Sequence, residues 1–447
     1  MMNKALFFPS FRGGGFGHIG RCLGLAQELK QRGWQTAFAL DGQHAARVEA
    51  TGQSVLRLRR PLSATIIKRL IKLVRRHRSS PPPAFTLFSD MNFQIARDGF
   101  YSAQIVRQGV EQELELVRRF KPDVLIGDTW PLTSIVGRRA GLPVVQIIKS
   151  VVHPACPRLI WWDEPPSGLT SPDIQPVFNP ALAEWGIPPI QRAEDLLSGD
   201  LLLVPSIPEL DPLPQGLSTT HYVGPLTRTD PRSAEPPDWF DELDPEHPLI
   251  YVTIGGGADP VGGVRLFQVL YQALGDLPLQ VVASTSAKLK PADLPSPPAN
   301  FVLKNWVPGL AMIARSDVVV FHGGYGTMME TIHCGAPSVI VPFHSEQQAN
   351  GQRLEASGAG IVIPHSTGPY QAIQHPWPAG PFAILVAPQP TLAPHQLRRA
   401  VERILSEEQF RLSTSRLKRQ LADYKGPALA ANLVQNFINQ HPPTRQL

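Results

Sequence analysis

The chain has 447 residues, of which 43% are hydrophobic and 18% charged, a composition that excludes disorder of the whole chain and allows large buried cores. Its length predicts two or three domains, and its formal net charge of +5 is compatible with anionic partners without identifying one. Three scattered cysteines without a C-x-x-C pair argue against a disulfide framework and a structural zinc site. The first apolar run is too short for a secretory signal, and no run of about 20 apolar residues follows, so we expect a cytoplasmic protein.

The first half of the chain alternates short apolar strands with helices. A strand at 4–10 precedes a helix over 20–33, in which Leu23, Ala26 and Leu29 recur at helical spacing. The alternation continues with strands at 35–41, 122–128 and 142–148 and with helices at 110–120 and 134–141. Strands that alternate with helices of about 10–15 residues indicate βαβ units and a parallel sheet.

A stretch rich in proline and aspartate, residues 227–247, predicts a linker to a second α/β unit. After it, strands are predicted at 249–256, 279–285, 301–306, 317–321 and 337–342, and helices at 265–274 and from Thr327. Residues 364–394 resemble an insertion with little helical period, and about 406–439 predicts two helices. We therefore predict an N-terminal domain at 1–226, a C-terminal domain at 248–405 and helices at 406–447 that pack back toward the N-terminal domain. Two such units place a ligand cleft between them, because ligands of open parallel sheets lie outside the carboxyl ends of the strands.

The stretch 305–360 is the most informative part of the sequence. A buried strand opens into the glycine-rich run His322-Gly323-Gly324-Tyr325-Gly326-Thr327, which begins a helix. Glycines let the backbone approach an anion closely, and a helix N-terminus offers free N–H groups and partial positive charge, so the run predicts a phosphate site. The alternative is an ordinary strand-to-helix turn with a capped helix, because glycine-rich turns are common.

Aromatic and polar side chains around this run suit the other parts of a nucleotide sugar. Trp306 stands at a strand end, where an indole can stack on a base. Glu330 lies three residues into the helix, within reach of a ribose diol. Glu346 and Gln347 follow the next strand and offer a carboxylate and an amide, which are usual partners of sugar hydroxyls.

The order of these residues resembles the sugar-nucleotide signature of the UDP-glycosyltransferases with the GT-B fold. That family includes bacterial antibiotic and plant secondary-product glycosyltransferases and, more distantly, the MurG-like lipid glycosyltransferases. The matching positions are Trp306-Val307-Pro308, His322 through Glu330, Gly335-Ala336-Pro337 and Glu346-Gln347-Gln348-Ala349-Asn350. The resemblance implies two Rossmann-like α/β domains whose parallel sheets face a central cleft. It also implies a nucleotide sugar, expected to be a UDP-sugar, as the donor substrate, with no cofactor and no catalytic metal.

The resemblance further implies donor-binding roles for individual residues. These are Trp306 and Val307 at the base, His322, Gly324, Gly326 and Thr327 at the diphosphate, Glu330 at the ribose, Glu346 and Gln347 at the sugar, and Gly255 and Gly256 in a second phosphate-side loop. Gly309 stands where the family has a glutamine, which leaves uridine and thymidine both open as the nucleoside.

The family's catalytic histidine lies in the first strand-to-helix loop, in a motif matched here by Gly17-His18-Ile19-Gly20-Arg21. The resemblance implies that His18 deprotonates an acceptor hydroxyl, assisted by Asp128, in an inverting displacement at the anomeric carbon. Imidazoles ordinarily titrate near pH 6.5, which suits proton removal at neutral pH, and a carboxylate partner fixes the tautomer. The alternatives are a loop histidine with structural hydrogen bonds only and an aspartate that caps a helix.

Residues 57–78 carry nine lysines or arginines and no acidic residue. Apolar residues recur at helical spacing, and the remaining positions include Lys68, Arg69, Lys72, Arg75 and Arg76. A basic amphipathic helix can lie on an anionic membrane surface, so we predict peripheral membrane contact and a lipid or otherwise membrane-associated acceptor. The alternative is a surface helix that packs its apolar stripe on the N-terminal domain. No aromatic interleaving supports nucleic acid as a partner.

Three other functions compete with sugar transfer. The hexapeptide GFGHIG at 15–20, with Asp41, fits the dinucleotide fingerprint and favours an NAD(P)-dependent oxidoreductase, although the fingerprint should follow its strand directly. A nucleotide-sugar epimerase or hydrolase of the same fold would consume the donor without an acceptor. A donor-binding subunit would need a partner chain. These patterns do not specify the sugar, the acceptor or the oligomeric state.

Overall fold

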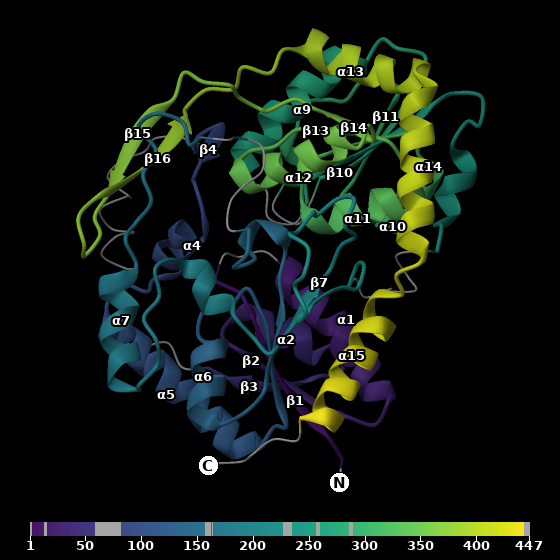
Figure 1. Cartoon of the computed structure of the whole chain (residues 1–447). Helices are drawn as coiled ribbons and strands as arrows, with labels where there is room; N and C mark the ends of the chain where they lie inside the picture. Colours follow the sequence, from purple (N-terminus) through teal and green to yellow (C-terminus); the bar gives the residue numbers. More distant parts are fainter. Residues whose placement is uncertain are drawn as a thin grey trace.

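Two parallel sheets, one from each half of the chain, form the framework of the molecule (Figure 1). The computed structural model describes residues 2–12, 16–58, 82–156, 162, 164–226, 235–255, 260–285 and 289–441. The basic stretch from 59 onward, with Lys68, Arg69, Lys72, Arg75 and Arg76, lies outside the described residues, as do Gly256 and the linker residues 227–234. Among the helices of the described residues, none is long and apolar enough to cross a membrane.

The N-terminal sheet has seven strands in the order β3-β2-β1-β5-β6-β7-β8, and all neighbouring strands are parallel. The strands are β1 (Lys4–Pro9), β2 (Gln35–Leu40), β3 (Ser54–Arg57), β5 (Val124–Asp128), β6 (Val144–Ile147), β7 (Leu201–Val204) and β8 (Thr220–Tyr222). The strand order reverses between β1 and β5, and such a switch point is where open parallel sheets bind ligands. Pro9 pairs with Asp128, so both strands end at the same edge.

Helices cover this sheet because their apolar residues recur on one face. In α1, the predicted apolar positions Leu23, Ala26 and Leu29 are buried, and Ile19, Cys22 and Leu25 are buried too, because α15 packs on this helix as well as the sheet. The helices and short 3-10 helices of this half are α1 (Gly17–Gln31), α2 (Gln43–Glu49), α4 (Met91–Asp98), α5 (Ala103–Phe120), α6 (Thr133–Ala140), η1 (Ser150–Val152), α7 (Gln175–Glu184) and η2 (Ala193–Leu197).

The C-terminal sheet has six parallel strands in the order β11-β10-β9-β12-β13-β14. They are β9 (Leu249–Thr253), β10 (Gln280–Ser284), β11 (Phe301–Lys304), β12 (Val318–Phe321), β13 (Ser338–Ile340) and β14 (Gly360–Val362). Their helices are η3 (Asp238–Glu242), α9 (Pro260–Leu274), η4 (Pro291–Asp293), α10 (Gly309–Arg315), α11 (Tyr325–Cys334), α12 (Ser345–Ala356), α13 (Pro394–Ser406) and α14 (Glu408–Ala422). The predicted architecture of two Rossmann-like domains with parallel sheets is confirmed.

Two predicted elements differ from the structure. The helix expected from Thr327 begins two residues earlier, at Tyr325, because Gly324 takes the extended conformation of an N-cap. Residues within 364–394 form a hairpin of β15 (Gln371–His375) and β16 (Phe382–Ala387). A third strand from the N-terminal half, β4 (Phe85–Leu87), pairs with β16, so this small antiparallel sheet joins the two halves of the chain at the left of Figure 1.

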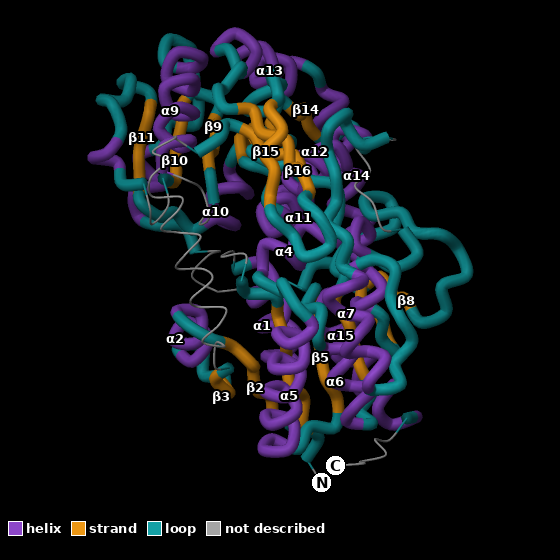
Figure 2. The backbone as a smooth tube through the Cα atoms, turned by 90° about the vertical axis from the view of Figure 1, so that its left-hand side faces the viewer, coloured by secondary structure: helices purple, strands orange, loops and turns teal. Residues whose placement is uncertain are grey.

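The chain also returns to the N-terminal half at its end. The last helix, α15 (Gly426–Gln440), packs on α1 and β7, whereas α14 packs on α11 of the other half (Figures 1 and 2). Where the chain crosses, Gly426 has φ +26°, and a Cβ at this position would lie 2.0 Å from the carbonyl oxygen of Pro225. The returning segment therefore lies directly against the segment that leaves the N-terminal half.

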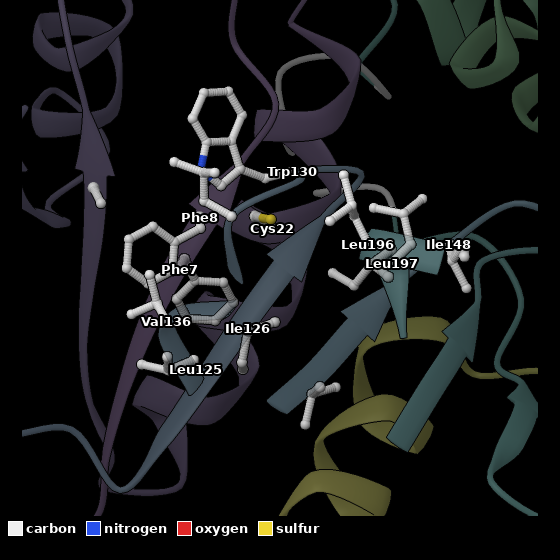
Figure 3. Packing of buried hydrophobic residues seen from close by; sticks show 14 of the residues in the cluster. Phe7, Phe8, Cys22, Leu125, Ile126, Trp130, Val136, Ile148, Leu196 and Leu197 are labelled. Atoms are coloured by element: carbon white, nitrogen blue, oxygen red, sulfur yellow. The ribbon is translucent and has the colours of Figure 1, made fainter. Parts of the chain in front are cut away.

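The largest hydrophobic core lies beneath the carboxyl ends of β1 and β5 (Figure 3). Phe7 and Phe8 of β1 and Trp130, two residues after β5, are at most 1% exposed. Trp130 stacks on Phe11 at 5.2 Å and donates its indole N–H to Glu113 at 2.7 Å. This packing fixes the loops that follow β1 and β5, and these loops carry the candidate site.

Candidate active site

His18 and Asp128 meet at the switch point of the N-terminal sheet. His18 lies in the first turn of α1, which follows β1, and Asp128 is the last residue of β5. The distance between His18 Nδ1 and Asp128 Oδ1 is 2.7 Å. The Asp128 side chain is fully buried, whereas 26% of the His18 side chain is exposed. The two residues that the sequence predicts as catalytic are therefore in contact, and His18 keeps an open side.

Arg21 joins this pair, although the sequence analysis gave it no role. Its Nε donates to Asp128 Oδ2 at 2.8 Å and its Nη2 donates to Oδ1 at 2.7 Å. Nη2 also lies 2.8 Å from His18 Nδ1. Burial on its own would raise the pKa of Asp128, but the charges of Arg21 and then His18 outweigh it, so this pKa lies below its ordinary value. The sequence feature that could have identified Arg21 is its position three residues after His18, because this spacing places both side chains on one face of α1.

The open side of His18 faces a pocket lined by both halves of the chain. The N-terminal half supplies an apolar wall made of Phe88, Met91, Val151 and Val152. The C-terminal half supplies Glu346, from the first turn of α12. The pocket thus combines the His18 imidazole, an apolar surface and the Glu346 carboxylate, which the sequence predicts at the sugar.

Lys149 lines the same pocket and forms an ion pair with Glu346. The two residues are far apart in the sequence and come from opposite halves of the chain. The charge of Lys149 is the main reason that the pKa of Glu346 lies well below its usual range. Glu346 is therefore a carboxylate throughout the neutral pH range.

Glycines from two loops, one after β9 and one after β12, lie close to the His322 ring. A Cβ at Gly255, which has φ +70°, would lie 2.5 Å from His322 Cε1, and a Cβ at Gly324 would lie 2.5 Å from Nε2. Burial, and next the charge of His344, lower the pKa of His322 to about 4. The ring is thus neutral at neutral pH and offers a hydrogen bond rather than a charge. Gly324 is the N-cap of α11 and has no side chain to cover the first-turn N–H groups, which include those of Gly326 and Thr327.

The residues predicted for the nucleoside end also lie together. Trp306 follows β11 with 65% of its surface exposed, and the adjacent Val307 is buried. A Cβ at Gly309 would lie 3.9 Å from Glu330 Oε2, an ordinary van der Waals distance, so position 309 adjoins this carboxyl. Burial raises the pKa of Glu330 to about 7.

Gln347 lies beside the glycine-rich run. Its Oε1 accepts a hydrogen bond from the Phe343 backbone N–H at 2.8 Å. A Cβ at Gly323, which has φ +86°, would lie 2.4 Å from the Gln347 carbonyl oxygen, so α12 packs directly on the run. The predicted diphosphate and sugar residues therefore belong to one continuous surface of the C-terminal half.

Comparison with known proteins agrees with this arrangement. Residues 268–376 match the family model described as "Erythromycin biosynthesis protein CIII-like, C-terminal domain". The PGL/p-HBAD biosynthesis glycosyltransferase of Mycobacterium tuberculosis is 29% identical over 59% of this chain, and the match spans 64% of that relative's length. The PGL/p-HBAD biosynthesis rhamnosyltransferase of Mycobacterium bovis is 27% identical over 77% of this chain, and the match spans 74% of that relative's length.

Solved structures show the same fold along the whole chain. The calicheamicin glycosyltransferase CalG4 superposes with a TM-score of 0.70 at 20% identity. The superposition covers 98% of this chain and 99% of the CalG4 chain. The spinosyn rhamnosyltransferase SpnG superposes with a TM-score of 0.66 at 18% identity, covering 97% of this chain and all of its own. The chain therefore has the GT-B fold, and its relatives in sequence and in structure are glycosyltransferases.

Proposed function

We propose that this protein transfers a hexose-type sugar from a nucleoside diphosphate sugar to a hydroxyl of a hydrophobic or lipid-like acceptor, with inversion at the anomeric carbon. The observation that carries the proposal is the contact of His18 with Asp128 at 2.7 Å, at the edge of a pocket lined by both domains. The base belongs to one domain and the predicted donor site to the other, as a transfer between two substrates requires.

The chemistry follows from the orientation of His18. Because Nδ1 faces Asp128, the tautomer suited to catalysis carries its hydrogen on Nδ1 and leaves Nε2 free to accept a proton. The acceptor hydroxyl gives its proton to Nε2 while its oxygen forms a bond to the anomeric carbon. The bond from that carbon to the phosphate oxygen breaks, and its electron pair leaves with the nucleoside diphosphate. Asp128 stabilises the imidazolium, and the N-terminus of α11 stabilises the leaving group.

The acceptor class is inferred from the apolar wall of the pocket and from related proteins. Phe88, Met91, Val151 and Val152 favour a hydrophobic group next to the reacting hydroxyl. SpnG was solved with thymidine diphosphate and with spinosyn aglycone, and other relatives are named for PGL/p-HBAD biosynthesis. Uridine and thymidine diphosphate sugars are therefore both tested as donors, with lipid extracts and apolar alcohols as acceptors.

The decisive variant is His18→Ala. Loss of a general base lowers turnover by roughly 10²- to 10⁴-fold, and we expect the Kd for free UDP or TDP to stay within about twofold because His18 lies on the acceptor side. Turnover is measured as nucleoside diphosphate release with and without acceptor, and the anomeric configuration of the product by NMR. The exposed His395 of α13 serves as the control in His395→Ala.

Three results would contradict the proposal. Unchanged turnover in His18→Ala removes this residue from the mechanism, and retention of configuration removes the inverting step. Nucleoside diphosphate release that no acceptor increases favours a nucleotide-sugar hydrolase, and conversion of the donor sugar without release favours an epimerase.

A further inference from the structure

We infer that Lys149 of the N-terminal domain completes the donor-sugar site and restricts it to sugars without a carboxylate. This inference rests on the proposed function and deepens it, because it names the class of sugar. It makes sugar recognition depend on residues of both domains.

Lys149 is held rigidly at the carboxyl end of β6. The neighbouring Ile148 N–H donates to the Leu203 carbonyl at 3.0 Å, and the Val152 N–H donates to the Lys149 carbonyl at 3.1 Å. Only 4% of the Lys149 side chain is exposed. A buried lysine with a fixed backbone presents its ammonium group in one place, at low entropic cost.

The ammonium group contacts partners from the C-terminal domain. It forms the ion pair with Glu346 and lies 5.2 Å from the centre of the Tyr325 ring, a distance that allows a cation–π contact. Among the described residues that line the pocket with His18, Lys149 is the one lysine or arginine. His322 is neutral at neutral pH, and the guanidinium of Arg21, which lies 5.8 Å from the centre of the same Tyr325 ring, is paired with Asp128.

The ion pair offers a neutral sugar both kinds of hydrogen bond. Glu346 is 31% exposed, so its carboxylate has lone pairs left for sugar hydroxyl donors. An ammonium group has three N–H donors, and the ion pair leaves the others for sugar oxygens. A sugar carboxylate would meet the negative charge of Glu346, while Lys149 and Arg21, the cations that the described residues place over Tyr325, are already paired with carboxylates. Like charges in a partly desolvated site discriminate strongly against the wrong ligand.

The test compares sugar preference in three variants of the full chain. Lys149→Met should raise the KM for the accepted neutral nucleotide sugar roughly tenfold or more, and Lys149→Arg should restore most of this loss. Glu346→Gln frees the ammonium for an anion, so the binding ratio of UDP-glucuronate to UDP-glucose should rise roughly tenfold or more. Binding is measured by calorimetry, so a variant without turnover still reports its preference, and dTDP-glucose replaces UDP-glucose if the wild type prefers thymidine.

Free nucleoside diphosphate provides the internal control. Its Kd should stay within about twofold in all three variants, because the ion pair contacts the sugar end only. Lys30→Met, at an exposed lysine near the end of α1, is the matched control and should leave KM unchanged.

The inference is overturned if Lys149→Met keeps the wild-type KM, if free nucleoside diphosphate binding weakens in parallel, or if Glu346→Gln keeps the wild-type binding ratio. If the wild type transfers sugar and a variant gives one of these results, only the inference fails. If the wild type transfers sugar from none of the donors, the proposed function fails as well.

Discussion

At the scale of single residues, Arg21 decides how the His18–Asp128 pair behaves. Both Asp128 oxygens accept hydrogen bonds from Arg21, so His18 shares its carboxylate with a permanent cation. Two hydrogen bonds from one guanidinium hold the Asp128 carboxylate in a fixed orientation beside the His18 ring. We therefore predict that Arg21 is a positioning residue for Asp128.

The variant Arg21→Met tests this role. We expect kcat to fall on the order of 10- to 100-fold as Asp128 shifts. The KM for the donor should stay within about twofold, because Arg21 contacts Asp128 and not the residues predicted for the donor. Arg21→Lys should recover part of the rate, and Arg119→Met, at an exposed site on α5, should change neither quantity. An equal loss of kcat in Arg21→Lys, or a rise in the donor KM as large as the loss of kcat, would contradict a positioning role for Arg21.

The sequence predicts some of these residues and misses others for a clear reason. Motifs that are continuous along the chain, such as the loop with His18 and the run from His322, can be recognised in one sequence. Lys149 and Glu346 are brought together only by the relative placement of two domains, which no local pattern encodes. Arg21 lies between these cases, since its helical spacing from His18 was visible but its carboxylate partner was not.

At the scale of elements, the hairpin of β15 and β16 shows where periodicity is informative. The run of β16, Phe382–Ala387, is continuously apolar, as expected of a buried strand. Its partner β4 has only three residues, too few for any pattern, and lies almost 300 positions away, so this sheet could not be predicted from the sequence. The basic stretch 57–78 shows helical spacing of apolar residues in the sequence, but most of it lies outside the described residues. Its contact with a membrane therefore stays a prediction.

We predict that Leu385→Ala weakens the sheet that joins the two domains. Leu385 pairs with Leu87 of β4 and is 5% exposed within a small apolar cluster. Truncating a buried leucine costs about 2–5 kcal/mol of the free energy of unfolding. Ile373→Ala, on the exposed face of β15 at 40% exposure, should cost less than about 0.5 kcal/mol. Guanidinium unfolding measures both variants, and equal losses would mean that the sheet contributes no specific packing.

At the scale of the whole molecule, buried histidines link stability to pH. His365 is fully buried, and both of its ring nitrogens lack a hydrogen-bond partner among the described residues. Burial, and next the charge of Arg265, lower its pKa to about 4. The unfolded chain binds a proton at this residue near pH 6.5, whereas the folded chain does not until about pH 4. The free energy of unfolding should therefore fall as the pH drops through this window.

The variant His365→Leu should flatten this pH dependence by up to about 3 kcal/mol between pH 6.5 and 4. His322 and His344, whose pKa values are also lowered to about 4, retain the rest of the slope. Denaturant unfolding at pH 7, 5.5 and 4 gives the comparison with wild type. A difference between the two proteins that is the same at every pH would show that His365 does not titrate differently in the folded state.

The double crossing of the chain between domains has a mechanical consequence. Gly224 lies against Tyr424 and Gly426 against Pro225, so the outgoing and returning segments touch at one place, on the side of the molecule with α14 and α15 (Figure 1). The β15–β16 hairpin grips β4 on the opposite side. The two domains are thus joined at two places on opposite sides of the molecule. A change in the relative placement of the domains would therefore strain the β4–β16 pairing or the crossing of the chain.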